Sequence, residues 1–147
     1  MNLTELNKAI LGCTNCPLRE FASRPVPGIG TLKAKYMLIG EAPGAEEDKA
    51  GVPFVGLSGK RLNKLIVLAG IDINECYLTN VCRCRPPANR TPRKLETRAC
   101  NHWLVEEIKL IRPEYIITLG STPLSLFSKS GVRSMHGTMF EYELEEE

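Results

Sequence analysis

The stretch Tyr36–Gly59, YMLIGEAPGAEEDKAGVPFVGLSG, decides the fold. Its first four residues are bulky and apolar and are followed by Gly40, a pattern typical of a short buried strand. The turn-forming residues after Gly40 leave Glu41 at the carboxyl end of that strand. In open α/β sheets, ligands bind beyond the carboxyl ends of the strands. The stretch therefore predicts a site that combines a carboxylate, flexible backbone and the aromatic ring of Phe54.

Helix and strand patterns alternate along the rest of the chain. Apolar spacing predicts helices over residues 2–11, 58–69, 92–110 and 121–129. Ser58 and Thr91 are the expected N-caps of the second and third helices. Short apolar runs predict strands at 76–79 and 115–119, and a weaker pattern suggests one at 138–142. Because such alternation is typical of a parallel sheet with right-handed crossovers, we predict a single α/β domain over residues 1–147.

The composition favours a globular domain and gives only one hint about a partner. The 147 residues are 43% hydrophobic, no stretch is long enough to span a membrane, and the amino terminus lacks the layout of a signal peptide, so we expect a cytoplasmic protein. The net charge of +2 says little, but basic residues gather at Arg83, Arg85, Arg90, Arg93, Lys94 and Arg98. This local basic surface could attract nucleic acid, although a solvated loop and helix face fits the charge equally well.

Six cysteines in a cytosolic chain favour a metal centre or reactive thiols over disulfides. Cys13 and Cys16 form a CxxC pair beside a proline, whereas Cys84 and Cys100 have 15 residues between them. These four thiols could converge on one centre. Zinc ribbons usually carry two CxxC pairs, so the second pair makes zinc less favoured, and a four-cysteine set binds a [4Fe–4S] cluster equally well. Cys82 stays open as an alternative ligand.

The remaining cysteine, Cys76, stands at the start of a predicted strand. It is most simply interpreted as a small buried apolar residue.

Four segments carry a resemblance to a known family: GEAPGAEED, GVPFVGLSG, LTNVCRCRPPANRTP and IITLGSTP. With the cysteine spacing, they resemble the family 4 uracil-DNA glycosylases, the iron–sulfur type, from about Cys13 to Gly137. The resemblance implies a three-layer α/β/α fold with a short parallel sheet. It also implies hydrolysis of the N-glycosidic bond of deoxyuridine in DNA, a step of base excision repair. The implied cofactor is a structural [4Fe–4S] cluster held by Cys13, Cys16, Cys84 and Cys100.

The same resemblance implies roles for residues of the site. Glu41 and Glu47 match the acidic catalytic motif, Phe54 matches the ring that stacks on the flipped uracil, and Asn80 matches the amide that reads the base edge. Gly40 would let the backbone approach the base. These roles are chemically coherent, because an extruded base needs a new stacking surface and an amide offers both a donor and an acceptor.

Each of these residues also has a plainer interpretation when it is taken alone. Glu41 and Glu47 could be surface or capping acids, a lone Phe54 is usually core, and Asn80 after a strand is usually a turn former. The functional interpretation is favoured only for the set in register with the family.

A basic segment near the cysteines is the expected contact with DNA phosphate. The resemblance places Arg85, Arg90 and Arg93 there, although a solvated loop remains an alternative for any one of them. The expected partner is therefore uracil-containing DNA.

The chain departs from the family after Gly137. The resemblance implies a further strand and a His-Pro motif whose histidine donates to uracil O2, yet the segment Thr138–Glu147 contains no His-Pro. Neither His102 nor His136 replaces it. We therefore expect a C-terminal strand to be missing. Three alternatives stay open: an active monomer, a catalytically impaired uracil- or DNA-binding module that is part of a larger replication or repair assembly, and a zinc-binding structural protein.

Overall fold

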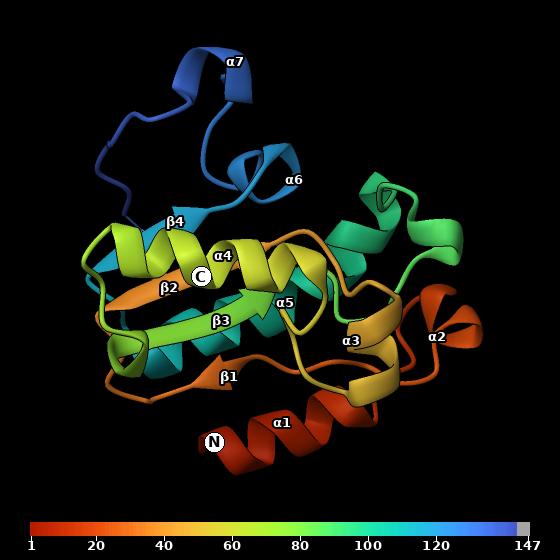
Figure 1. Ribbon diagram of the computed structural model, residues 1–147. Coiled ribbons are helices and arrows are strands. Elements are labelled where there is room, and N and C mark those ends of the chain that lie inside the picture. Colours follow the sequence, from red (N-terminus) through yellow and green to blue (C-terminus); the bar gives the residue numbers. More distant parts are fainter. Residues whose placement is uncertain (144–147) are drawn as a thin grey trace.

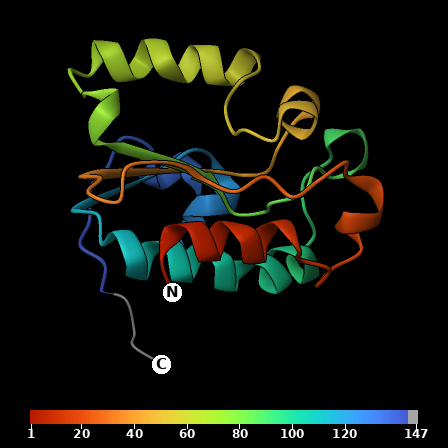
Figure 2. The same ribbon diagram turned by 90° about the horizontal axis from the view of Figure 1, so that it is seen from below.

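The computed structural model describes residues 1–143. They form three layers, with a four-stranded sheet between two layers of helices (Figures 1 and 2). The strands are β1 (Ile29–Gly30), β2 (Tyr36–Gly40), β3 (Cys76–Asn80) and β4 (Tyr115–Thr118), in the spatial order β1-β3-β2-β4. β2 pairs in parallel with both β3 and β4, which confirms the α/β class. The three strands predicted from the sequence are thus parallel, whereas β1, which was not predicted, is antiparallel to β3 and makes the sheet mixed at this edge.

Helices cover both faces of the sheet. Figure 2 shows α4 (Leu57–Leu68) on one face, and α1 (Leu3–Leu11) and α5 (Lys94–Ile111) on the other. The shorter helices are α2 (Leu18–Phe21), α3 (Ala45–Ala50), α6 (Ser121–Leu124) and α7 (Val132–Met135), with 3-10 turns η1 (Ile73–Glu75) and η2 (Pro87–Asn89). Among the described residues, none of these helices has the length and apolar character that a membrane crossing requires.

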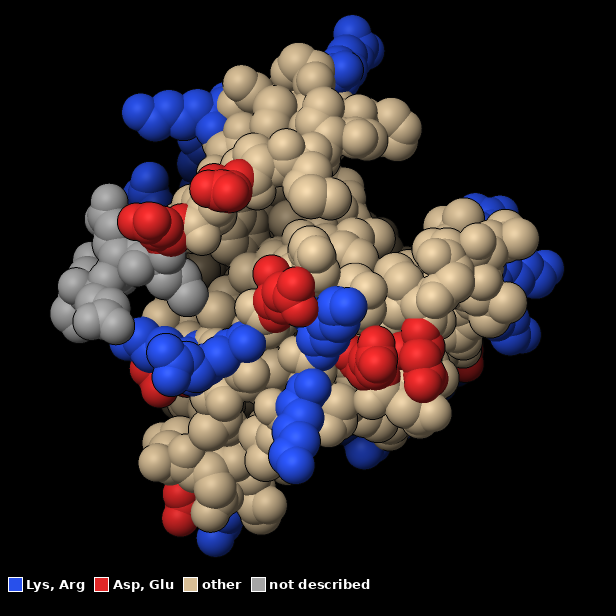
Figure 3. All heavy atoms as spheres, turned by 90° about the vertical axis from the view of Figure 1, so that its left-hand side faces the viewer, with Lys and Arg blue, Asp and Glu red and all other residues tan. Residues whose placement is uncertain are grey.

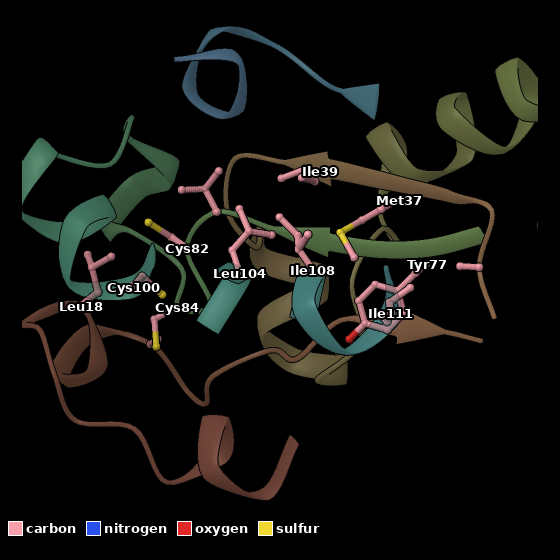
Figure 4. Close-up of a cluster of buried hydrophobic side chains, with 13 residues drawn as sticks. Leu18, Met37, Ile39, Tyr77, Cys82, Cys84, Cys100, Leu104, Ile108 and Ile111 are labelled. Atoms are coloured by element: carbon pink, nitrogen blue, oxygen red, sulfur yellow. The ribbon is translucent and has the colours of Figure 1, made fainter. Parts of the chain in front are cut away.

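Alternation along β2 divides the core into two parts. Met37 and Ile39 belong to the cluster that packs against α5, whereas Leu38 belongs to the cluster that packs against Leu62 and Ile66 of α4. Figure 4 shows the first cluster, with cysteine side chains at one end of it. A strand buried on both faces reads as a continuous apolar run, which is why the sequence identifies β2 correctly.

The helix starts differ from the predictions. α4 begins at Leu57 with Gly56 as its N-cap, so Ser58 lies inside the first turn. Gly59 is required there, because a Cβ at this position would lie 1.8 Å from the Phe54 carbonyl oxygen. α5 begins after Arg93 rather than after Thr91, and its first turn is capped by the Glu96 side chain, which accepts from the Arg93 N–H at 2.7 Å.

Two segments also differ from the predictions. The acidic run after Gly44 forms the short helix α3, which the sequence analysis did not anticipate. The strand suggested at 138–142 is not formed. This part of the described chain follows α7 without regular secondary structure. The expectation that a C-terminal strand is missing extends to residues 144–147, which lie outside the described residues.

The amino ends of the strands form a face of mixed charge. Figure 3 shows Lys and Arg side chains interspersed with Asp and Glu side chains on this face. Lys35 lies over the stacked rings of Tyr36 and Tyr115, at the starts of β2 and β4. The candidate site residues predicted from the sequence lie instead at the opposite, carboxyl end of the strands.

Two leucines of α4 provide a matched test of the two-sided core. Leu62 is 6% exposed and Leu65 is 61% exposed. We expect Leu62→Ala to lower the free energy of unfolding by about 2–5 kcal/mol, because it leaves a cavity under the sheet. Leu65→Ala should change it by no more than about 0.5 kcal/mol. Urea unfolding followed by circular dichroism measures both, and equal losses would contradict the packing of α4.

Candidate functional site

The carboxyl ends of the three parallel strands meet at one place. Gly40 at the end of β2 pairs in register with Asn80 at the end of β3, and Glu41 follows directly. Thr122, in α6 just after β4, donates its hydroxyl hydrogen to Glu41 Oε2 at 2.7 Å. The predicted acid and the predicted amide therefore lie together, and the acid is held by Thr122, which no sequence motif singled out.

Gly40, Phe54 and Asn80 form one compact group. A Cβ on Gly40 would lie 2.5 Å from Asn80 Oδ1 and 2.8 Å from Phe54 Cζ, so only glycine fits between the amide and the ring. Phe54 has a φ of 57°, a left-handed conformation that is strained for a bulky residue. Such strain persists only where the surrounding structure enforces it, and it is concentrated at functional sites.

Glu47 is occupied by the backbone of the loops around the site. Its Oε1 accepts from the Gly44 N–H at 3.0 Å, and its Oε2 accepts from Val55 at 3.0 Å and from Gly56 at 2.6 Å. The carboxylate therefore joins the start of α3 to the segment that follows Phe54. These contacts favour a positioning role for Glu47, and its direct role in catalysis stays a prediction.

The four cysteines singled out from the sequence line one pocket. Cys13 and Cys16 come from the loop after α1, Cys84 from the loop after β3, and Cys100 from α5. Cys82 lines the same pocket, and Figure 4 shows Cys82, Cys84 and Cys100 close to Leu18. Thiols from distant parts of the chain thus line one pocket, and their role as ligands of one centre stays a prediction.

The last cysteine lies elsewhere. Cys76 packs in the core cluster on the α4 face of the sheet, with its thiol donating to the Asp72 carbonyl at 3.4 Å. It is a buried small residue, as the sequence suggested.

N–H donors face two of the pocket sulfurs. The Arg83 backbone donates to Cys100 Sγ at 3.3 Å, and the Trp103 indole donates to Cys13 Sγ at 3.3 Å. The pKa of Cys100 is lowered to about 7, chiefly because the Cys82 thiol donates to it and also because the Arg83 charge lies nearby. Burial raises the pKa of Cys84 to about 12. Donors aimed at sulfur are the environment that thiolate ligands require.

The thiols of this pocket are the type of donor that binds an iron–sulfur cluster. No three His, Cys, Asp or Glu side chains within residues 1–143 are placed to hold one metal ion. Four thiols from three segments line one hollow, with N–H groups donating to two of the sulfurs, and such a donor set is chemically compatible with a [4Fe–4S] cluster.

The three arginines expected at DNA differ in their surroundings. Arg90 is engaged in a two-pronged ion pair with the buried Glu96, at 2.7 and 3.0 Å, and this pairing lowers the pKa of the Glu96 carboxyl. Arg85 donates through Nε to the side chain of Asn89 at 2.8 Å. Arg93 is exposed, and its backbone N–H donates to Glu96. Arg93 is thus the most available of the three for a phosphate.

Neither histidine lies among these groups. His102 is exposed on α5 beside Trp103, within 3.4 Å of Asn15. His136 is exposed at the end of α7. Neither position is at the carboxyl end of a strand, where the acid and the amide lie.

The fold and the site define a class: α/β/α proteins with an aromatic, amide and carboxylate group at the carboxyl end of the sheet and a cysteine pocket beside it. The model of the uracil DNA glycosylase superfamily matches residues 27–144. The chain belongs to this superfamily.

Comparisons with curated proteins give the same result. The chain is 43% identical to a type-4 uracil-DNA glycosylase of Pyrobaculum aerophilum over 82% of this chain and 61% of that protein. It is also 43% identical to a type-4 uracil-DNA glycosylase of Thermotoga maritima over 83% of this chain and 64% of that protein. The chain thus spans about three fifths of the length of these relatives. A DNA polymerase of Bacillus phage SP01 is 30% identical over 86% of this chain but over only 14% of that polymerase.

A positioning role for Glu47 has a local signature in hydrogen exchange. We expect Glu47→Ala to speed amide exchange at Gly44, Val55 and Gly56, because each of these N–H groups loses its acceptor. Glu46→Ala is the matched control, since this neighbouring acid is exposed. Hydrogen exchange resolved by NMR measures the effect. Unchanged exchange at the three amides in Glu47→Ala would contradict the positioning role of Glu47.

Proposed function

We propose that this chain is the uracil-binding domain of a type-4-like uracil-DNA glycosylase, and that it hydrolyses the N-glycosidic bond of deoxyuridine in DNA. The observation that supports this most directly is the group of Gly40, Phe54 and Asn80 beside Glu41 at the strand ends. A glycosylase must take its target base out of the stack, and this group offers a ring face and an amide at one point.

Binding of the base is assigned to Phe54 and Asn80. The Phe54 ring replaces the neighbouring bases lost on extrusion, and base–aromatic stacking is worth about 1–3 kcal/mol. The Asn80 side chain carries both an N–H donor and a carbonyl acceptor, which match the O4 and N3–H groups of uracil. Gly40 leaves the space between them that any Cβ would fill.

Bond cleavage is assigned to Glu41. Breaking the bond between the sugar C1′ and uracil N1 builds positive charge on the sugar and negative charge on the base. A carboxylate near the sugar stabilises the first of these charges or orients the attacking water. The hydroxyl of Thr122 keeps the Glu41 carboxylate in place. Glu47 contributes by holding the loops that carry Gly44 and Val55.

Cys13, Cys16, Cys84 and Cys100 would hold a [4Fe–4S] cluster. When bound, the cluster supplies a structural cross-link between the loop after α1, the loop after β3 and α5. Cys82 lines the same pocket and stays an alternative ligand. DNA is the proposed partner, with Arg93 as the foremost phosphate contact and with Arg85 and Arg90 beside it.

Loss of a single proposed ligand should remove the iron. We expect the parent protein to contain about four iron atoms per chain and Cys84→Ala to contain almost none. Cys76→Ala is the matched control, because this buried cysteine lies on the other face of the sheet. Iron analysis and visible absorbance measure the difference. Stoichiometric zinc without iron in the parent would favour the structural zinc alternative.

Activity on a defined oligonucleotide tests the proposed function. We expect the cluster-loaded chain to release uracil from a single-stranded oligonucleotide, seen as strand scission after alkali. Asn80→Ala should lower the rate by roughly 10²–10³-fold, by analogy with the loss of one donor at an oxyanion site. Asn63→Ala, at an exposed position of α4, should leave it unchanged.

The opposite outcome is also defined. If the loaded chain leaves the oligonucleotide uncut while a longer version with a His-Pro strand cuts it, the catalytic proposal for this chain is wrong.

A second candidate is a uracil- or DNA-binding module within a larger replication protein. The similarity to a short portion of a phage DNA polymerase favours it. It requires uracil-dependent DNA binding without release of the base. Equal affinity for uracil- and thymine-containing strands would exclude the base-specific form of this candidate.

A further inference from the structure

Arg83 is a buried cation whose hydrogen bonds are incomplete. Arg83 is 1% exposed, and its Nη2 group donates to Glu107 Oε1. Its Nε and Nη1 atoms are buried and have no acceptor within the described residues. Since a guanidinium has five N–H groups, the three on Nε and Nη1 are unsatisfied. A charged group left in this state carries a large desolvation cost, so an acceptor is to be expected.

Glu107 cannot supply that acceptor. It is fully buried and already accepts the Thr79 hydroxyl at 2.8 Å and the Tyr77 hydroxyl at 2.6 Å. The Glu107 carboxylate pairs with Arg83. Glu107 lies seven residues after Cys100 in α5. Tyr77, Thr79 and Glu107 therefore form a support that fixes the guanidinium without satisfying it.

The pocket of cysteines adjoins this arginine. Arg83 lies between Cys82 and Cys84 in sequence and lines the same pocket as Cys13, Cys16 and Cys100. Its backbone N–H already donates to Cys100 Sγ. A [4Fe–4S] cluster with four thiolates carries a net charge of about −2 in its oxidised form, and hydrogen bonds to its sulfurs tune such centres. A cluster in this pocket would offer what the guanidinium lacks.

We propose that Arg83 is a positioning residue of the cluster, donating its unpaired N–H groups to cluster sulfur and balancing part of the negative charge. This inference rests on the proposed [4Fe–4S] cluster. It assigns the buried Tyr77–Thr79–Glu107 group the task of orienting the guanidinium.

Two spectroscopic and kinetic readouts test the proposal apart from activity. We expect Arg83→Met to shift the terminal iron–sulfur stretching frequencies upward in resonance Raman spectra, because the bonds to sulfur lose their hydrogen-bond donors. We also expect iron loss to a ferrous chelator to be several-fold faster. Arg83→Lys, which keeps the charge, should show an intermediate effect. Arg85→Met, in the same loop, should show neither change, because Arg85 donates to Asn89 instead.

Arg83→Met alone leaves the buried Glu107 carboxylate without its cation. The double variant Arg83→Met/Glu107→Gln removes both charges, so it separates the loss of the arginine from the effect of an unpaired carboxylate. It also provides a neutral pair if Arg83→Met alone does not fold. The proposal requires the double variant to keep the Raman shift and the faster iron loss. Parent-like values in the double variant, or in Arg83→Met, would overturn it. A parent protein without iron would instead contradict the proposed cluster itself, so the two failures are distinguishable.

Discussion

The parallel pairing of β2 with β3 is the constraint on which the rest of the structure depends. Gly40 is opposite Asn80, and the ladder continues beyond the strands through hydrogen bonds from Val81 to Gly40 and from Cys82 to Glu41. The same register thus aligns the amide with the glycine and joins the cysteine loop to the acid. A slip of one residue would turn every side chain of the strand to the other face and separate these groups.

A second connection joins the cysteine pocket to the acidic motif. The buried Asp48 in α3 accepts from the Ser23 N–H at 2.9 Å, and Ser23 lies two residues after the end of α2. α2 itself begins two residues after Cys16. The segment around the pocket is therefore attached to α3, and Glu47 in α3 is attached to the loop that follows Phe54. A cluster that fixes the cysteine loops would, through these contacts, restrict the loops that enclose a base without touching it.

The sequence predicts the parts of this structure that depend on local pattern, and less of what depends on contacts. Buried on both faces, β2 and β3 are apolar runs, so their positions were identifiable. β1 has only two residues and arises from pairing with β3, which no local pattern encodes. The prediction of Ser58 as N-cap is wrong because α4 begins at Leu57 after Gly56, and the Gly56 N–H donates to Glu47, a tertiary contact that no local pattern encodes. The cysteine grouping was predictable from spacing and resemblance, whereas Thr122 and Arg83 become visible only through their partners.

The two acids of the motif illustrate how neighbouring residues of one type acquire different tasks. Glu47 spends both oxygens on backbone N–H groups, so it has little capacity left for a substrate. Glu41 uses one oxygen for Thr122, and no partner of its other oxygen is found among the described residues. Phe54, held at a positive φ between these loops, then presents its ring beside Gly40 without further rearrangement. The Glu47 bonds to Val55 and Gly56 fix the two residues that follow Phe54, so under the proposed function the loop would be ordered before a base binds. Preorganisation of this kind lowers the entropy that binding must overcome.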